Sequence, residues 1–437
     1  MLPNKGRGIF YGWYIVFVAF IANFMSIGTS FYILNAFMEP LCNARGWTRT
    51  DVNLALVIGT ICGAFGQFLY GILVIRIGPR ILMLVCSIIA GNAFILIGQT
   101  HSLAYFYLFY AILFFGNGGY GGIVANTVVN NWFIRKRGSA LGLASAGQSL
   151  SGAILPFVAM VIIIGKELDD AFWLIGLIIM CVGPLSWLIV RNWPESYGLT
   201  PDGIQTDNLQ ETSKDKVLKT TSEKSIVFPK NNIKDKRGSY LWTLPLLVRN
   251  GAFWRLGIGY ALALIGVVGV MSQLKPYFKD IGFGDMTAMG MMAATALIGT
   301  IGKYFWGRMC DRFDPRSVVA VLLLANGVGL TMVFFHHFFL MLILFIIVFG
   351  FAVGGVWTTY PIVIAELFGR QSFPTVSRFL SFFLVFELTG YIIAGQSFDR
   401  MGSYDPAYVV FILSFFISAF LIFSTKKPLV NPNGIKE

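Results

Sequence analysis

Residues 299–316 of this chain read G-T-I-G-K-Y-F-W-G-R-M-C-D-R-F-D-P-R. They place Lys303 within an apolar run that begins near Met286, and they end in a compact charged turn. On insertion scales a lysine near the centre of a membrane helix costs roughly 2.5 to 3.5 kcal/mol, so such a residue usually faces a polar cavity or a partner. One interpretation is that Lys303 snorkels toward the charged turn. We favour the other, that it reaches inward to a functional site.

The composition of the whole chain indicates a membrane protein. Of its 437 residues, 56% are hydrophobic and only 12% are charged, whereas soluble domains carry about 25% charged residues. Windows of about 20 residues, the length that spans a bilayer as a helix, locate the candidate spans. Twelve apolar stretches lie near residues 13–38, 52–75, 81–99, 103–130, 139–164, 171–190, 252–278, 286–308, 317–335, 338–364, 377–398 and 407–424.

Lysine and arginine are divided unevenly between the two sets of loops. Outside the central loop, the loops that we assign to the cytoplasm hold 15 of them, and the alternate loops hold 6. The positive-inside rule therefore predicts a multi-pass protein of the plasma (inner) membrane with both termini in the cytoplasm. The net charge of +12 then reflects topology and contact with lipid headgroups, and we expect no nucleic-acid partner.

Cysteine and histidine give no sign of a catalytic or metal site. The five cysteines are widely spaced and the three histidines lie near loops, so we expect no disulfide framework, metal or cofactor. No H-E-x-x-H, nucleotide-binding glycine-rich loop or nucleophile elbow occurs. An enzyme is therefore not expected.

A short motif occurs twice along the chain. Gly307 follows Gly71 by 236 residues, with arginines at matching positions after each, and Phe349-Gly350 follows Phe115-Gly116 by 234. A near-constant shift of this kind is typical of a transporter built from two parallel repeats. We therefore predict an all-α membrane protein with twelve transmembrane helices in two pseudo-symmetric six-helix bundles. The predicted parts are an N-terminal bundle (1–190), a cytoplasmic linker (191–245) that includes a short surface helix, and a C-terminal bundle (246–437).

The repeated motif is also our candidate for a gate. Its glycine allows close approach of two helices, its acid can cap or pair, and its arginines can hold neighbouring helices together at the cytoplasmic side. The candidate gating residues are Gly71, Arg76, Gly78 and Arg80 in the first copy and Gly307, Asp311, Arg312 and Arg316 in the second. Plain positive-inside anchoring would explain the arginines but not the repeated spacing.

Polar side chains within the apolar stretches are candidates for substrate contact. These are Tyr32, Asn117, Tyr120, Gln148 and Trp357, and for Trp357 simple packing is the alternative. Polar groups in this setting need a partner or a wet cavity.

Glu387 is the second charge within an apolar stretch, about ten residues from either end. A nearby lysine would hold this carboxylate ionised, whereas an isolated one takes up a proton. Lys303 and Glu387 are therefore candidate partners. An anionic substrate that displaced Glu387 from Lys303 would couple anion movement to proton movement, and direct contact between the two is a hypothesis.

With these features the chain resembles the major facilitator superfamily over its whole length. The twelve stretches, the central linker and the two glycine-arginine turns carry the resemblance. The chain departs from the pattern at Ile75, where an aspartate is expected, and at Asp314, which replaces a glycine.

Within that superfamily the chain is similar to the monocarboxylate porter and oxalate/formate antiporter group. The match lies in Trp132-Phe133-x-Arg135-Lys136-Arg137-x-x-Ala140-x-Gly142-x-Ala144-x-Ala146-Gly147 and, more weakly, in Gly12-Trp13-Tyr14. The resemblance implies a substrate-binding cation at Lys303, where these porters carry an arginine. Gly299 stands where the monocarboxylate porters have a proton-handling aspartate, which leaves Glu387 as a substitute. The second lysine of oxalate-type members aligns near Phe383, so a monoanion is favoured over a dianion.

These observations predict a secondary transporter of a small organic monocarboxylate, monomeric, that works by alternating access with proton symport or anion exchange. One alternative is a polyspecific exporter of amphipathic or cationic compounds, in which Glu387 is the binding charge. Another is a non-transporting sensor that binds a metabolite and signals through the central linker.

Overall fold

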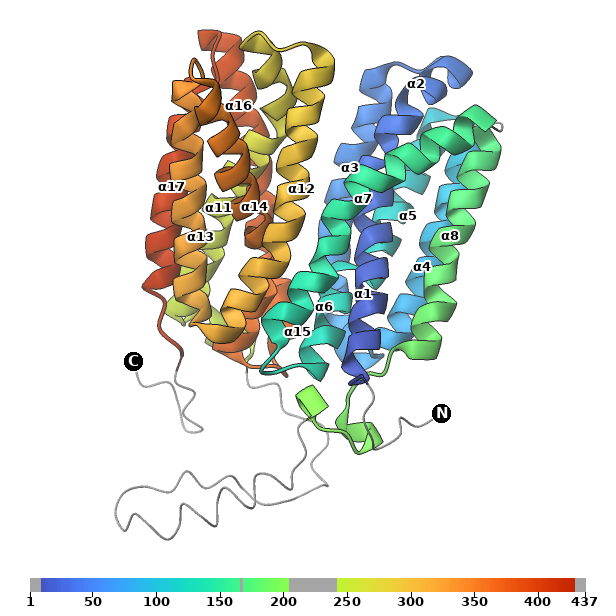
Figure 1. The fold of residues 1–437 in the computed structure, drawn as a ribbon. Helices are drawn as coiled ribbons and strands as arrows, with labels where there is room; N and C mark the ends of the chain where they lie inside the picture. The colour runs from blue at the N-terminus through green and yellow to red at the C-terminus, as the bar shows by residue number, and fades with distance from the viewer. Residues whose placement is uncertain (1–8, 166–167, 204–241, 429–437) are drawn as a thin grey trace.

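The computed structural model describes residues 9–165, 168–203 and 242–428, and almost all of them are helical (Figure 1). The surface helix predicted within the central linker falls between residues 204 and 241, outside the described residues. The described part contains no strand. The prediction of an all-α protein is therefore confirmed.

The first half of the chain forms one bundle. Its elements are α1 (Gly12–Ile27), the π-helical turn η1 (Gly28–Tyr32), α2 (Leu34–Arg45), α3 (Arg49–Arg76), α4 (Pro79–Gln99), α5 (Leu103–Tyr120), α6 (Gly122–Trp132), α7 (Arg137–Gly165) and α8 (Leu168–Ile189). The short turns η2 (Glu195–Tyr197) and η3 (Pro201–Gly203) follow it.

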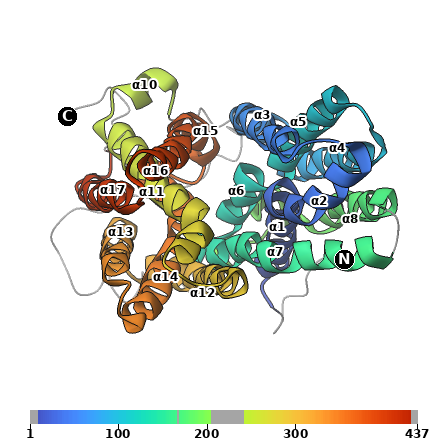
Figure 2. The same ribbon diagram turned by 90° about the horizontal axis from the view of Figure 1, so that it is seen from above.

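The second half forms the other bundle after a short helix, α10 (Leu244–Val248). Its elements are α11 (Gly251–Asp280), α12 (Asp285–Arg312), α13 (Pro315–Thr331), η4 (Met332–Phe335), α14 (Phe339–Phe368), α15 (Phe373–Leu384), the 3-10 turn η5 (Val385–Glu387), α16 (Leu388–Met401) and α17 (Asp405–Phe423). Figure 2 shows the two bundles side by side.

Each predicted apolar stretch lies in a helix or in a pair of helices joined end to end. Eleven of the described helical segments are long and apolar enough to cross a membrane. The twelfth span is α12, a helix of 28 residues, whose mean hydropathy is lowered by Lys303 and by the charged residues at its end. The chain is thus an integral, multi-pass membrane protein.

Three spans are interrupted near their middle. The first contains the π-helical turn η1, Gly121 separates α5 from α6, and η5 separates α15 from α16. At membrane depth such breaks occur where the backbone is buried in protein or lines a water-filled cavity, so they mark positions to search for a binding site.

The two bundles meet at one end of the molecule. The start of α1 and the ends of α8 and α17 lie at this end, which we call the linker face (Figure 1). The opposite end we call the open face. The bundles contact each other through α7 against α12 and through α3 against α15.

The same backbone contact closes both helix pairs. A Cβ atom added at Gly307 would lie 2.2 Å from the carbonyl oxygen of Gly138, and one added at Gly71 would lie 3.1 Å from that of Pro374. Pro374 follows Gly138 by 236 residues, the shift that also separates Gly307 from Gly71. The sequence repeat is therefore a structural repeat at the level of single contacts.

The facing surfaces of the bundles separate toward the open face. On α3, Phe68 packs edge-on against Phe379 and at a tilt against Phe382 of α15. Leu54 and Ile61, on the same side of α3 at intervals of seven residues, are exposed. On α12 the side that carries buried Gly307 continues to Met286, which is 85% exposed. The structure is closed at the linker face and open at the other.

Candidate functional site

Lys303 connects the two bundles. Its side chain is 5% exposed, and its ammonium group donates hydrogen bonds to the carbonyl oxygen of Ser145 (3.1 Å) and to Oε1 of Gln148 (3.2 Å), both on α7. The lysine reaches across to the other bundle and does not snorkel toward Arg308 and Arg312. Of the two interpretations of Lys303, the structure favours the inward one.

No carboxylate neutralises Lys303 among the residues that the structure describes. The two acceptors are neutral, and the proposed ion pair with Glu387 is not formed. An ammonium group has three N–H donors, so one remains for a ligand. A buried cation without a counter-ion attracts an anion strongly, because the surroundings screen its charge weakly.

Glu387 lies in the break between α15 and α16. Its Oε2 atom is buried and has no hydrogen-bond partner among the described residues. Tyr391, one turn further along, lies within electrostatic range of both Glu387 and Tyr32. Tyr391 is thus close to both Glu387 and Tyr32, and no hydrogen bond or ion pair joins Glu387 to Lys303 among the described residues.

Tyr32 packs on α7 one helical turn from Gln148, which binds Lys303. Its ring packs on Gly152, where an added Cβ atom would lie 3.1 Å from it, and Gly152 is one helical turn from Gln148. Tyr32 is partly exposed. We call the set Tyr32, Ser145, Gln148, Lys303, Glu387 and Tyr391 the interface site.

Asn117 and Tyr120 lie away from the interface site, in a buried hydrogen-bond network. Asn117 donates to the oxygens of Ser26, Thr29 and Ser30, and it accepts from the hydroxyl of Tyr120 at 2.7 Å. Both side chains are buried. In this structure they hold α5 against η1, and contact of Asn117 and Tyr120 with substrate stays a prediction.

Trp357 of α14 is partly exposed. It follows Gly354, whose backbone lies against Gly299 of α12. The structure does not bring Trp357 to the interface site through any contact among the described residues.

Asp311 closes the linker face. Its carboxylate accepts hydrogen bonds from the backbone N–H groups of Gly138 (2.5 Å) and Ser139 (2.8 Å) and from the Ser139 hydroxyl (2.5 Å). These donors belong to the first turn of α7. The backbone N–H groups of a first helical turn have no acceptor within their own helix. A carboxylate at this position also interacts favourably with the helix dipole, so α12 of one bundle caps α7 of the other.

The remaining motif residues act within single bundles or are exposed. Arg80 donates from Nε to the Trp187 carbonyl and stacks on that ring. Arg316 bonds Asp314 and the Thr425 carbonyl. Gly78 has a φ of +88°, which favours glycine at the start of α4, and Arg76 and Arg312 are exposed.

The sequence did not identify two further connections between the bundles. Arg370, in the turn before α15, donates to the Asn131 carbonyl (3.0 Å) and to Glu195 (2.5 Å). Arg378 of α15 packs against Gly71 of α3. Both arginines had been counted only as positive-inside charges, and no local pattern distinguishes them from such charges.

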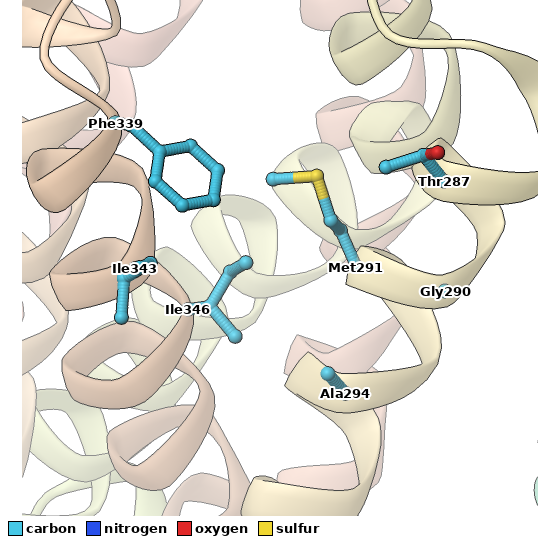
Figure 3. Close-up of a pocket in the computed structure, with 7 residues that line it drawn as sticks. All are labelled: Thr287, Gly290, Met291, Ala294, Phe339, Ile343 and Ile346. Carbon is cyan, nitrogen blue, oxygen red and sulfur yellow. The ribbon is translucent and has the colours of Figure 1, made fainter.

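Figure 3 shows an apolar groove between α12 and α14 near the open face. Its volume is about 380 Å³, and it is lined by Thr287, Gly290, Met291, Ala294, Phe339, Ile343 and Ile346. It offers no charged group to an anion. No cluster of three or more possible metal ligands occurs among the described residues.

Two pseudo-symmetric bundles that close at one face over a buried, charged interface define the class of secondary transporters. The chain belongs to the Major Facilitator Superfamily, whose family model matches residues 16–306 and 256–437. Membership in this family indicates a transporter and not an enzyme.

Curated relatives are distant. The glycerol-3-phosphate transporter of Bacillus subtilis (strain 168) is 24% identical over 68% of this chain, and the match spans 66% of that relative, slightly less than two thirds. Monocarboxylate transporter 12-B of Danio rerio is 22% identical over 97% of this chain and 88% of its own length. A solved structure of the transporter FucP in the outward conformation matches with a TM-score of 0.66 at 15% identity, covering 93% of this chain and 97% of that one.

Proposed function

We propose that this transporter moves a small organic monocarboxylate, with Lys303 binding the carboxylate group. The observation that carries the proposal is the position of Lys303. It is buried between the bundles, it is held by two neutral oxygens of α7, and no acidic side chain of the described chain pairs with it. A ligand carboxylate would supply the missing charge.

A monoanion fits the interface site better than a dianion, because Lys303 is the cation of the site and Glu387 opposes a second negative charge. The two transporter relatives support an anionic substrate, since their names specify a phosphate ester and monocarboxylates. In our proposal the substrate enters from the open face, and separation of α7 from α12 releases it at the linker face.

We further propose that the linker face is cytoplasmic in the plasma membrane and that the protein acts as a monomer. Residues 191–245 would then form a cytoplasmic connection between an N-terminal bundle (1–190) and a C-terminal bundle (246–437). The excess of lysine and arginine in the loops at this face supports this orientation.

Glu387 is our candidate for coupling. Its carboxylate has an oxygen without a partner, and a group of this kind can exchange a proton during the cycle. If Glu387 takes part in the same transport cycle as Lys303, their substitutions should interact. Strictly additive losses in Lys303→Gln, Glu387→Gln and the double variant would refute coupling between them.

The test is uptake of labelled lactate, pyruvate, formate and oxalate into proteoliposomes, with and without an inward proton gradient. We expect the wild type to take up at least one monocarboxylate, Lys303→Gln to lose uptake, and Lys426→Gln, which removes an exposed lysine, to retain it. A response to the gradient would indicate symport, and stimulation by internal carboxylate would indicate exchange. No uptake of any acid would refute the proposal.

A second candidate function follows from the unpartnered carboxylate of Glu387, which would also suit an organic cation. In that case the protein is an exporter of amphipathic cations. Glu387→Gln would abolish transport of such compounds, and Lys303→Gln would leave it intact.

A further inference from the structure

Three side chains at the contact between the bundles contain buried polar atoms without a hydrogen-bond partner. They are Oδ1 of Asn126, both side-chain polar atoms of Asn130, and Nε of Arg378. Leaving such a group unpaired costs about 1 to 3 kcal/mol, so native proteins rarely keep several together without a reason. Each lies within about six residues of the end of its helix at the linker face, whereas Lys303 lies nine residues from the end of α12.

The two asparagines lie on one side of α6. Gly122, Asn126 and Asn130 are four residues apart and therefore share one side of the helix. Gly122 and Asn126 are partly exposed, whereas Asn130 is 0% exposed. Figure 2 shows α6 on the inner side of its bundle, and it packs on α15 of the other bundle. Two amides with unpaired atoms thus share one side of a helix that contacts the other bundle, and the amide nearer the end of α6 is fully buried.

Arg378 brings a cation to the same region from α15. Its Cβ atom lies against Gly71 of α3, and its guanidinium lies over the rings of Phe379 (4.4 Å) and Phe68 (5.7 Å). Phe68 is nearly one turn farther from the linker face than Gly71, so the side chain points into the protein and does not snorkel to the near surface. The ring contacts offset part of the cost of burial. No described carboxylate pairs with Arg378.

We infer that Asn126, Asn130 and Arg378 line the linker-side half of the substrate pathway, which is closed in this structure, and that Arg378 is a second contact for the anionic substrate. The inference rests on the proposed function for the identity of the anion. When the bundles separate at the linker face, water reaches both amides and relieves their unpaired state. The guanidinium then offers a bidentate site for a carboxylate leaving Lys303.

Access from the linker face tests the pathway without reference to any substrate. In a variant without the native cysteines, Asn130→Cys is exposed to a membrane-impermeant maleimide on either side of oriented vesicles. We expect labelling from the linker face only. The control is Asn326→Cys in α13, since Asn326 is also 0% exposed with an unpartnered Oδ1 but lies within one bundle, and we expect no labelling. Equal labelling of the two positions would overturn the pathway.

The kinetics of Arg378 variants test the anion contact. For labelled lactate or pyruvate we expect Arg378→Gln to raise KM at the linker face at least tenfold and to change KM at the open face less than twofold. Arg378→Lys, which keeps the charge, should recover most of the loss, and Arg76→Gln, an exposed arginine at the same face, should have no effect. Equal changes at both faces, or none, would refute the contact. If the wild type carries none of the acids, the proposed function and this contact both fail, and the labelling still decides the pathway.

Discussion

Replacing Asp311 by asparagine should shift the protein from the linker-closed to the linker-open state. The carboxylate accepts three hydrogen bonds from the first turn of α7. In asparagine one of the two oxygens is replaced by an NH2 group, which cannot accept, so only the bonds to the remaining oxygen are kept. Hydrogen bonds to a charged group contribute about 1.5 to 3 kcal/mol each, and the dipole interaction about 0.3 to 1 kcal/mol. We estimate a loss of about 2 to 4 kcal/mol, which is roughly a 30- to 900-fold change in the equilibrium.

Distances between spin labels at Phe157 of α7 and Met286 of α12 would report this shift. Both side chains are largely exposed, at 71% and 85%, on segments toward the open face. We expect the wild type to show mainly the long distance and Asp311→Asn to gain a population at a shorter one. Asp314→Asn is the control, because the partners of Asp314 among the described residues are Arg316 and Ser317 of its own bundle. An unchanged distribution in Asp311→Asn, or the same change in both variants, would refute the role of Asp311.

Three other variants test the remaining features of the structure. Ile75→Asp places a carboxylate at the position in the first repeat that matches Asp311, where it can accept a hydrogen bond from the start of α15. Because Pro374 has no N–H group to donate, we expect this carboxylate to stabilise the linker-closed state about half as much as Asp311 does. The readout is a larger population at the long label distance and slower transport. Gly307→Ala should lose the linker-closed state because its Cβ atom would lie 2.2 Å from a backbone oxygen, whereas Gly290→Ala, with nothing within 4 Å, should behave as the wild type. Tyr120→Phe removes one buried hydrogen bond, worth roughly 0.6 to 1.7 kcal/mol in membrane proteins; we expect a lower Tm with transport retained, and loss of transport at unchanged Tm would argue against a packing role.

The sequence was sufficient to predict the helices and their arrangement in two repeats. The helix spans follow from the length of the apolar runs. The repeat follows from the shift of 236 residues between Gly71 and Gly307. The sequence also marked Lys303 and Glu387 as unusual, because a charge in a membrane helix is costly wherever the helix lies.

The partners of these charges were not predictable, because they depend on how the bundles approach each other. Lys303 donates to Gln148 of α7, which lies 155 residues earlier in the chain. No local sequence pattern specifies that pairing. For the same reason the sequence did not show which groups bond Asn117, and its contact with substrate stays a prediction. A polar residue in a glycine-rich run needs partners, and the sequence does not show that η1 supplies them. Arg378 lies near the start of α15, and from the sequence alone an arginine near a helix end cannot be distinguished from a surface charge.

Equilibrium binding of a labelled monocarboxylate to the purified protein tests most directly whether Lys303 is the anion site. We predict that Lys303→Gln weakens binding at least tenfold, which corresponds to about 1.4 kcal/mol, and that Lys303→Arg and the surface control Lys426→Gln bind the anion within a few-fold of the wild type. Binding by Lys303→Gln within twofold of the wild type would contradict the account, since the substrate charge would then be held elsewhere.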